Sequence, residues 1–389
     1  MAINEMGFNQ AATVLNAIVG QATGKTNLTA TNTSSFVSVA KLGLETGYDA
    51  LSTAISQVLS RTIFSVRPYT RKFQGLEADS LRYGNHVRKI NYADSAFEED
   101  DRIKLTDSYS IDQYTVKKPK AIQTNFYGEN VYQRSVTIYR DQLDCAFSGP
   151  EEFARFISGV MSNAQDQIEQ AHEDMARATL ANLIGGIISI NNTPQVIHLI
   201  TEYNAWSGES ITASTVFNPE VFPNFARWMY GRIATLSKLL RERTTLYHQN
   251  FTAGDIARHT PLEDQRLYLL GNNMDQVSTN VLATTFNDEY LRMLPYEEVM
   301  YWQSIKSPDA VKITAGYTAA DGTVTSASVD TTGIMGLLID REAAGYTVVN
   351  EWAQPTPFNA RGGYYNQYWH FTDRYWNDFS ENAILLKLD

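Results

Sequence analysis

The clearest local signal in the chain is residues 148–186, SGPEEFARFISGVMSNAQDQIEQAHEDMARATLANLIGG. Apolar side chains recur there every three or four residues, with Gln, Asp and Glu on the other side, which predicts one amphipathic helix. Ser148 followed by Glu151 matches a capping box, and Pro150 is tolerated in the first turn. Gly185-Gly186 is expected to end the helix. At 1.5 Å per residue, roughly 35 residues extend for about 50 Å, which is long for a globular enzyme.

The regions before this helix differ in how much they can bury. Residues 1–35 begin with a short apolar stretch and become a polar, small-residue tract, which is expected to be extended or mobile. From Leu44 to Val58 apolar residues recur every three or four residues, which predicts one helix over about residues 37–60. Residues 81–127 place apolar residues thinly among charged ones and predict a long two-stranded excursion. Because it has little core of its own, this excursion is expected to lie on another surface.

The chain after the long helix mixes short strands and helices. The predicted elements are strands at 196–200, 266–270 and 334–339, helices at 222–240 and about 274–292, a tight turn at Asp321-Gly322, and aromatic, β-rich closing strands over 364–388. This mixture predicts an α+β fold. The aromatic residues of the last stretch are expected to fill a packed sheet.

Composition excludes several classes of protein. The 389 residues include 32 Lys and Arg against 43 Asp and Glu, a net charge of −11, which argues against a protein that grips a polyanion. A hydrophobic fraction of 43% with only 19% charged residues is globular rather than disordered. The single cysteine, Cys145, excludes an intrachain disulfide framework. The N-terminus has no secretory pattern and no long apolar run is present, so we expect a soluble protein made in a cytoplasm.

Two motifs imitate catalytic signatures. The segment Gly20-Gln21-Ala22-Thr23-Gly24-Lys25-Thr26 has three residues between its glycines where a phosphate-binding loop needs four, and helical residues precede it. We therefore interpret it as part of a mobile arm. The segment His172-Glu173-Asp174-Met175-Ala176 begins like a zinc-protease helix but lacks the second histidine, which favours a histidine on the helix surface.

The sequence of the excursion contains one acidic run and one basic run. Glu98-Glu99-Asp100-Asp101 is expected to be a solvated turn or an intersubunit salt-bridge patch. Lys117-Lys118-Pro119-Lys120 has the same interpretation, or meets an acidic neighbour in an assembly. The histidines are scattered without useful pairing. The sequence thus predicts no catalytic, cofactor-binding or metal-binding residue, and the protein is expected not to be an enzyme.

Three stretches, taken in order, resemble the major capsid proteins of tailed bacteriophages, which share the Hong Kong 97 fold. They are residues 131–153, from Val131-Tyr132-Gln133-Arg134 into Gly149-Pro150; residues 336–342, Gly-Leu-Leu-Ile-Asp-Arg-Glu; and residues 368–384, from Tyr-Trp-His-Phe to Glu-Asn-Ala-Ile. The likeness is greatest to capsid proteins of small podoviruses of the phi 29 type. The resemblance implies an N-arm at 1–75, an E-loop at 76–130, a P domain at 131–204 with its spine helix at about 150–185, an A domain at 205–345, and P-domain strands at 346–389.

The resemblance also implies a function. A capsid protein of this family assembles as pentamers and hexamers into an icosahedral head that encloses double-stranded DNA without reading its sequence. Scaffolding and portal proteins are expected partners, no membrane is involved, and the protein is expected in the virion after assembly in the host cytoplasm. On this interpretation the E-loop lies across a neighbouring subunit, and partners order the arm.

Two alternatives remain open at this point. An encapsulin-like bacterial shell protein shares the fold that the resemblance implies. From a different class, a carbohydrate-binding or hydrolytic protein could use the aromatic residues 364–376 with Asp373 or Asp378, although no carboxylate pair with a defined separation supports it. A nucleotide-hydrolysing protein ranks below both.

Overall fold

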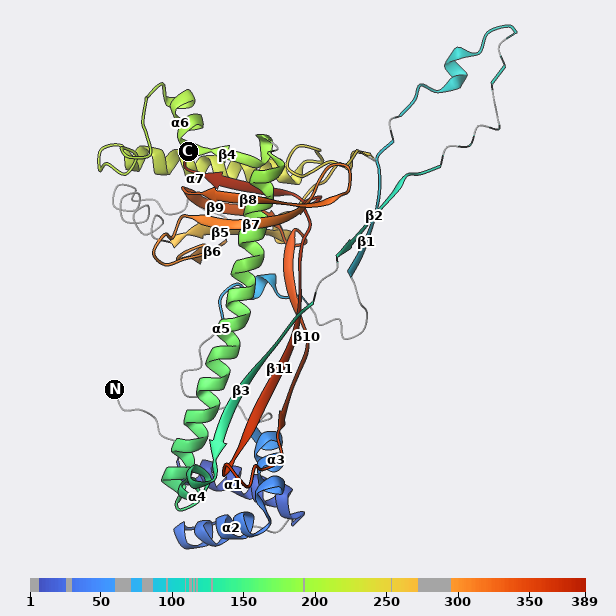
Figure 1. Cartoon of the computed structure of the whole chain (residues 1–389). Helices are drawn as coiled ribbons and strands as arrows, with labels where there is room; N and C mark the ends of the chain where they lie inside the picture. The colour runs from blue at the N-terminus through green and yellow to red at the C-terminus, as the bar shows by residue number, and fades with distance from the viewer. Residues whose placement is uncertain are drawn as a thin grey trace.

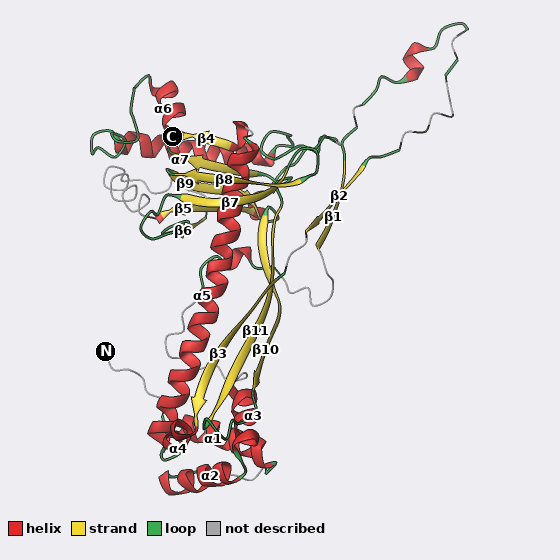
Figure 2. Ribbon diagram, in the orientation of Figure 1, coloured by secondary structure: helices red, strands yellow, loops and turns green. Residues whose placement is uncertain are grey.

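A computed structural model shows an elongated molecule with a head at one end, a long stem and a helical cluster at the other end (Figure 1). A narrow hairpin projects from the junction of head and stem (Figure 2). The structure describes residues 7–25, 30–59, 71–78, 87–95, 97–108, 110, 111, 114, 116, 118–126, 129–191, 193–252, 254–271 and 295–389.

Helix α5 (Pro150–Ile190) is the long predicted helix and joins the two ends of the molecule. Its N-cap is Gly149 rather than Ser148, whose hydroxyl instead donates to the Cys145 carbonyl at 2.6 Å, so the predicted capping box is wrong. The prediction that Gly185-Gly186 ends the helix is also wrong. A Cβ added at Gly186 would lie 2.3 Å from the Phe379 ring, so this glycine permits close packing inside the helix.

The stem pairs α5 with a three-stranded antiparallel sheet in the order β10 (Ala344–Pro355), β11 (Tyr364–Asn377) and β3 (Asn130–Tyr139). The prediction of a packed aromatic sheet is confirmed for Tyr365 and Phe371 of β11, which are buried, and is wrong for Tyr375, which is exposed. The ladder between β10 and β11 shifts register between Val348 and Asn350. Helix α4 (Arg140–Ala146) connects β3 to α5.

The head is built on a five-stranded sheet in the order β4 (Val196–His198), β12 (Ala383–Lys387), β9 (Ile334–Asp340), β5 (Gln265–Leu270) and β6 (Tyr296–Val299). Helices α6 (Leu199–Ser207) and α7 (Phe222–Arg241) cover one face. The C-terminal half of α5 and the hairpin β7 (Val311–Thr318) and β8 (Val324–Thr331) cover the other. The mixed α+β prediction is confirmed here.

Individual head elements follow the predictions closely, with one revision. The predicted helix 222–240, the strands near 266–270 and 334–339, and the turn at Asp321-Gly322 are confirmed. The strand at 196–200 is shorter than predicted, because α6 begins at Leu199. The predicted helix at 274–292 lies outside the described residues. Short 3-10 turns lie at η1 (Gln74–Leu76), η3 (Thr193–Gln195) and η4 (Leu262–Asp264).

The N-terminal residues form a packed cluster of three helices, α1 (Phe8–Thr23), α2 (Thr33–Glu45) and α3 (Tyr48–Leu59). Leu15, Ile18 and Phe36 are fully buried in one core with the first turns of α5. The helical spacing of residues 11–18 is confirmed by α1, whereas the expectation that the polar tract from Gln21 to Ser35 is extended or mobile is wrong at both ends of the tract, which lie in α1 and α2. The single helix predicted over 37–60 is two helices, because Gly47 adopts a positive φ of 108° between them.

The predicted two-stranded excursion is confirmed as a hairpin of β1 (Val87–Tyr92) and β2 (Ala121–Phe126), paired antiparallel from Val87↔Phe126 to Tyr92↔Ala121. Beyond these strands the chain continues to a tip that carries the 3-10 turn η2 (Asp101–Lys104). No helix within the described ranges is long and apolar enough to cross a membrane.

Candidate assembly interface

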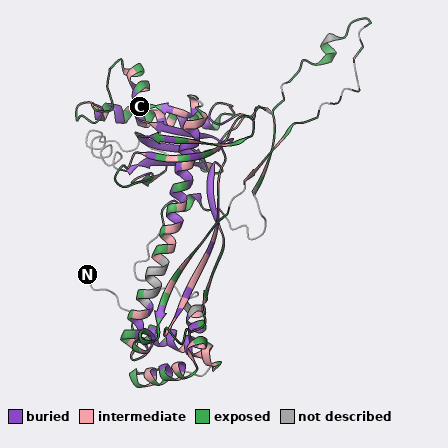
Figure 3. Ribbon diagram, viewed as in Figure 1, coloured by how far each residue is buried: buried purple, intermediate pink, exposed green. Residues whose placement is uncertain are grey.

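The tip of the hairpin carries exposed apolar residues, and Figure 3 colours the described part of the tip as exposed. Phe97 is fully exposed, Tyr114 is 87% exposed and Ile103 is 79% exposed. Val116 and Leu105 are also exposed. Single exposed apolar residues are ordinary on a protein surface. Five of them on the two arms of one narrow hairpin form a surface that a partner can bury. We call residues 97–116 the hairpin tip.

The acidic run lies on this tip. Glu98, Glu99 and Asp101 are exposed, and Asp100 pairs with Arg102, two residues along the chain, at 2.5 Å. The hydrogen bond from Arg102 lowers the pKa of Asp100. Of the basic run, Lys118 and Lys120 are exposed on the returning limb, and Lys117 lies outside the described residues. A solvated turn is thus what one copy of the chain shows, and a role between subunits stays a prediction.

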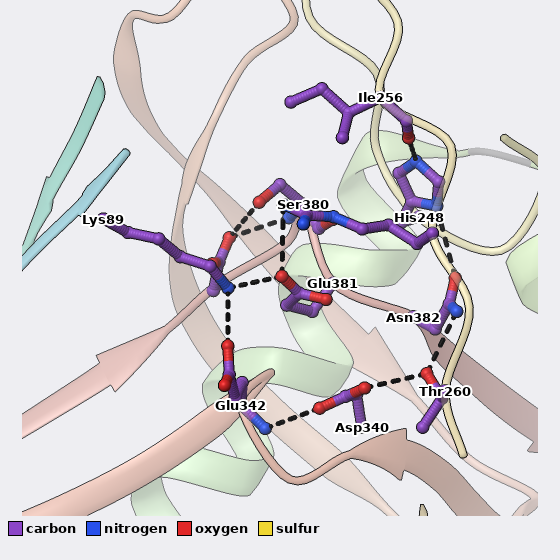
Figure 4. Close-up of polar contacts among 11 residues, drawn as sticks. Lys89, His248, Ile256, Thr260, Asp340, Glu342, Ser380, Glu381 and Asn382 are labelled. Carbon is purple, nitrogen blue, oxygen red and sulfur yellow. Dashed lines mark hydrogen bonds and ion pairs between the residues drawn. The ribbon is translucent and has the colours of Figure 1, made fainter. Parts of the chain in front are cut away.

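The foot of the hairpin is fastened by Lys89 of β1 to three carboxylates of the head (Figure 4). The Lys89 ammonium donates to Asp378 Oδ2 at 2.9 Å, to Glu342 Oε2 at 3.1 Å, and to Glu381. Burial disfavours the ammonium, but the charges of Asp378 and Glu381 outweigh it and raise the pKa of Lys89. We call Lys89, Glu342, Asp378 and Glu381 the hairpin anchor.

The head holds these carboxylates in place. Ser380 donates its amide to Asp378 Oδ1 at 2.9 Å and its hydroxyl to the same atom at 2.6 Å. Arg258 pairs with Glu381 at 3.1 Å. Burial raises the pKa of Glu381, and Lys89 and Arg258 oppose that shift. Because Asp378 and Glu381 are nearly inaccessible to water, their charges depend on these cations.

A buried polar network lies behind the anchor, as Figure 4 shows. His248 contacts the Ile256 carbonyl at 2.6 Å and Asn382 Oδ1 at 3.2 Å, and burial lowers its pKa. Asn382 donates to the Thr260 hydroxyl, which donates to Asp340 at 2.8 Å. Because fully hydrogen-bonded networks rigidify a core, the carboxylates of the hairpin anchor are attached to a rigid part of the head.

A second contact holds the limb just beyond β1. Asp94 accepts the Ala257 amide at 2.7 Å and pairs with Arg243. Gly254 approaches so closely that an added Cβ would lie 2.6 Å from the Cβ of Ala93. On the returning limb, Glu129 pairs with Arg374 of β11, with Arg374 Nε at 3.1 Å. Both limbs of the hairpin are therefore tied to the body before they extend away from it.

Of the residues singled out as possible catalytic groups, Asp378 belongs to the hairpin anchor and the others lie away from it. His172 is only 1% exposed, so the prediction of a histidine on the helix surface is wrong. Gly20 to Thr23 form the end of α1, with Gly24 as its left-handed C-cap, which places the imitation of a phosphate loop in a helix. Asp373 and Asp378 are buried in different polar clusters, which gives no support to a hydrolytic pair. Among the described residues, no group of three or more His, Cys, Asp or Glu could hold a metal ion.

Sequence patterns did not reveal the anchor. Its three carboxylates lie 253, 289 and 292 residues from Lys89, so no local spacing connects them. The segment Asp340-Arg341-Glu342 is visible in the sequence as the end of a buried strand, which does not indicate that Glu342 meets Lys89.

Comparison with known proteins agrees with this architecture. A chain from the solved capsid structure of Staphylococcus phage Andhra superposes with a TM-score of 0.52 at 11% identity and covers 84% of this chain and 87% of its own length. A second similar chain comes from a solved structure of the head fiber and inner core protein gp22 of native bacteriophage P68. It gives a TM-score of 0.54 at 12% identity and covers 84% of this chain and 87% of its own length. These likenesses show the fold, which confirms the prediction of a Hong Kong 97-type capsid fold. No curated protein sequence matches the chain.

The family is shown by the sequence itself. The profile described as Phi29-like phage major capsid protein matches residues 15–387, which is nearly the whole chain. The match includes the long helix, the hairpin and the closing strands, so it confirms the resemblance seen in the sequence. The chain belongs to the Phi29-like phage major capsid protein family and is a subunit of a phage head shell.

Proposed function

We propose that this protein forms pentamers and hexamers that close into an icosahedral head around double-stranded DNA. Its role is structural rather than enzymatic, scaffolding and portal proteins act with it, and assembly takes place in the host cytoplasm. Membership of the capsid family supports the multimeric shell. The net charge of −11 suits a container, because a wall with few clustered cations does not adhere strongly to packaged DNA.

We assign the parts of the chain by the family plan. Residues 1–75 are the N-arm, 76–130 the E-loop, 131–204 the P domain with the spine helix, 205–345 the A domain and 346–389 the returning P-domain strands. The projecting hairpin, α5 and the head sheet support these divisions. The N-arm of this chain is a folded cluster over most of its length, so partners are not needed to order α1.

The single observation that carries the mechanism is the apolar tip on an anchored hairpin. Phe97, Ile103 and Tyr114 cannot be buried by the limb that carries them, so we infer that a second copy covers them. The hairpin anchor fixes the limb in the free subunit. Docking a limb that is already oriented loses less conformational entropy than docking a flexible one. Many such contacts, repeated around a shell, give stability through multivalency.

A second surface of matching character lies on the stem sheet. Cross-strand partners in the register share one face, and the open face presents Asn350, Trp352, Gln354, Thr372, His370, Tyr368, Val131, Gln133 and Ser135. None of these is Lys, Arg, Asp or Glu. Val131 is 68% exposed, and Trp352, 47% exposed, stacks on His370 with ring centroids 3.9 Å apart. A depletion of charge with exposed aromatic residues is typical of the centre of an interface.

The experiment replaces the apolar tip and measures assembly. Phe97→Ser, Ile103→Ser and Leu105→Ser together are expected to leave the folded subunit intact by circular dichroism but abolish closed shells in negative-stain microscopy. The matched control is Val324→Ser, which removes an apolar residue of similar exposure from the head hairpin of β7 and β8 and is expected to assemble normally. Normal shells from the triple variant would refute the proposed role of the hairpin.

A further inference from the structure

The head carries an open cleft between the end of α6 and the outer side of α7. Its volume is about 820 Å³, and its lining includes Trp206 of α6, Glu209 just beyond it, and Arg227, Trp228 and Gly231 of α7. Trp206 is 70% exposed, although tryptophan is highly buried on average. A Cβ added at Gly231 would meet no atom of the described residues within 4 Å, so the middle of the cleft is open. The cleft can therefore accept side chains from another molecule.

The outer side of α7 is basic, although the whole chain carries a net charge of −11. The helix contains Arg227, Arg232, Lys238 and Arg241 and no Asp or Glu. Arg232 is paired with Glu202 of α6, with Nε 2.6 Å from Oε2, and the other three cations are exposed. At 3.6 residues per turn, these three fall within about 60° of each other around the helix axis, so they form one stripe. We call this stripe, together with Trp206 and Trp228 of the cleft, the α7 face.

A second surface, around strand β6, combines apolar and acidic residues. Leu262, Tyr296 and Met300 are exposed there. Glu263 and Glu298, which lie beside them in the sequence, are exposed as well. Leu262, Glu263 and Tyr296 line one shared hollow of about 650 Å³, so the segment before β5 and the start of β6 form a continuous surface. We call these five residues the β6 edge.

The other charges near the β6 edge are compensated within the subunit. Asp264 pairs with Arg341, with Oδ1 3.2 Å from Nε. Arg266 and Glu297 both line the hollow, where burial raises the pKa of Glu297 and the charge of Arg266 opposes that shift. The two exposed carboxylates of the β6 edge therefore give this surface its acidic character.

The α7 face and the β6 edge match in apolar character and in charge, and they lie on different sides of one head. Helix α6 follows β4, which is one edge strand of the head sheet, whereas β6 is the other edge strand. Figure 1 shows α6 and β6 on opposite sides of the head. The two surfaces of one copy therefore do not meet each other, but those of two copies can. A contact between different surfaces of identical subunits is heterologous, and it closes into a ring when the rotation between neighbours permits.

We propose that the α7 face of each subunit binds the β6 edge of the next, and that this contact closes the rings of five and six copies. The inference rests on the proposed function, which calls for rings without saying which surfaces form them. The two indoles of the α7 face pack against the exposed apolar side chains of the next copy, and its cations face the two carboxylates. Aromatic anchors supply most of the binding energy of an interface, and complementary charges orient the encounter and disfavour wrong pairings.

The first experiment reverses the charge of each surface in the full chain. Arg227→Glu with Lys238→Glu makes the α7 face acidic, and Glu263→Lys with Glu298→Lys makes the β6 edge basic. Like charges then face each other, so each variant alone is expected to stay monomeric in light scattering under conditions in which the wild type forms rings. All four side chains are exposed, so circular dichroism is expected to show a folded subunit. Rings formed by either variant alone would overturn the proposal.

Mixing the two variants tests the pairing itself. An acidic α7 face fits a basic β6 edge, and the unchanged surfaces of the two variants also fit each other, so the variants must alternate around a ring. An alternating ring closes only with an even number of copies. Native mass spectrometry of the mixture is therefore expected to show hexamers without pentamers, whereas the chain with all four substitutions is expected to form both. A mixture that stays monomeric would overturn the pairing of these two surfaces.

A matched control changes the net charge by the same amount elsewhere. Lys25→Glu with Lys41→Glu replaces two exposed cations of the helical cluster and is expected to form rings like the wild type. The wild type gives a further measurement that needs no variant. Its ring dissociation constant is expected to rise several-fold between about 0.1 and 1 M salt, because the Debye length falls from about 10 to 3 Å, and an unchanged constant would contradict the charge pairing.

The outcomes separate this contact from the proposed function. A wild type that forms no rings under any condition would count against the capsid assembly itself. A wild type that forms rings, together with charge-reversed variants that form them equally well, would leave that function intact and exclude this contact alone.

Discussion

The N-terminal helices and the hairpin are both limbs that precede the long helix, and they differ in where their apolar side chains lie. Leu15, Ile18 and Phe36 are fully buried in a core that the chain builds for itself. Phe97 and Ile103 stay exposed on a hairpin that Lys89 ties to the head at its foot. The first limb is thus stabilised within the subunit, and the second offers its apolar surface to other molecules. Substitutions in the two limbs should therefore separate folding from assembly.

The largest effect on stability is expected at the hairpin anchor. Lys89→Met leaves Asp378 and Glu381 buried without their shared cation, and removing one partner of a buried ion pair costs about 3–5 kcal/mol. Equilibrium denaturation measures the loss. The double variant Lys89→Met with Asp378→Asn should recover part of it, because Arg258 still faces Glu381 whereas Asp378 has lost the cation it was paired with. No loss in Lys89→Met would show that the foot is not held by charge.

The helical cluster gives the next effect. Leu15→Ala in α1 removes a fully buried side chain and is expected to destabilise the subunit by about 2–5 kcal/mol, depending on how far the core collapses. Thr13→Ala, at an exposed position of the same helix, is the control and should change the unfolding midpoint little. If Leu15→Ala unfolds like the wild type, α1 is not part of a core and the contrast with the hairpin disappears.

The break between α2 and α3 is expected to show a smaller effect. Gly47 has open space around its Cα but a φ of 108°, which L-residues rarely adopt. Gly47→Ala should therefore destabilise the cluster by about 1 kcal/mol or somewhat more through backbone strain alone. Thermal unfolding measures this loss. In the same measurement the control Gly159→Ala, inside α5 and with no atom within 4 Å of the added Cβ, should be neutral or stabilising.

The smallest effect is expected at Asp94, on the exposed side of the foot. The Ala257 amide, and then Arg243, lower the pKa of Asp94, so its contribution to stability is present above pH 4 and is lost as pH falls through the lowered value. Because the pair is partly exposed, Asp94→Asn should cost less than about 1 kcal/mol at pH 7 and less again at pH 3. Denaturation at the two pH values tests the sign, and an equal loss at both would exclude an electrostatic origin.

Much of the fold was predictable because it depends on local periodicity. The stripe of α5, the helix at 222–240 and the buried strand at 334–339 each bury one face or both, so their patterns are visible in the sequence. The burial of α1 was also visible in principle, since Ala11, Leu15, Ile18 and Val19 follow helical spacing. The core that these residues enter was not visible, because it includes Phe153 and Ile157 of α5, more than a hundred residues later.

The remaining features depend on contacts between distant parts of the chain. A glycine occupies position 186 inside the helix because the ring of Phe379, nearly two hundred residues later, packs where a Cβ would lie. His172 flanks the apolar stripe of α5, and its burial follows from strands that come before and after it in the sequence. Lys89 meets its carboxylates only when the closing turns of the head reach the foot of the hairpin. Such polar contacts leave no period in the sequence, so the hairpin anchor could not be predicted from it, whereas the thin spacing of apolar residues over 81–127 did predict the hairpin itself.

The unbroken length of α5 has a mechanical consequence. A straight helix of 41 residues is about 60 Å long, and a tilt of about 5° at the head would move its far end by about 5 Å. The helix therefore acts as a lever arm that magnifies small rotations. Subunits with nearly identical heads can thus meet their neighbours at different angles, which is the adjustment that a curved wall built from one kind of molecule requires.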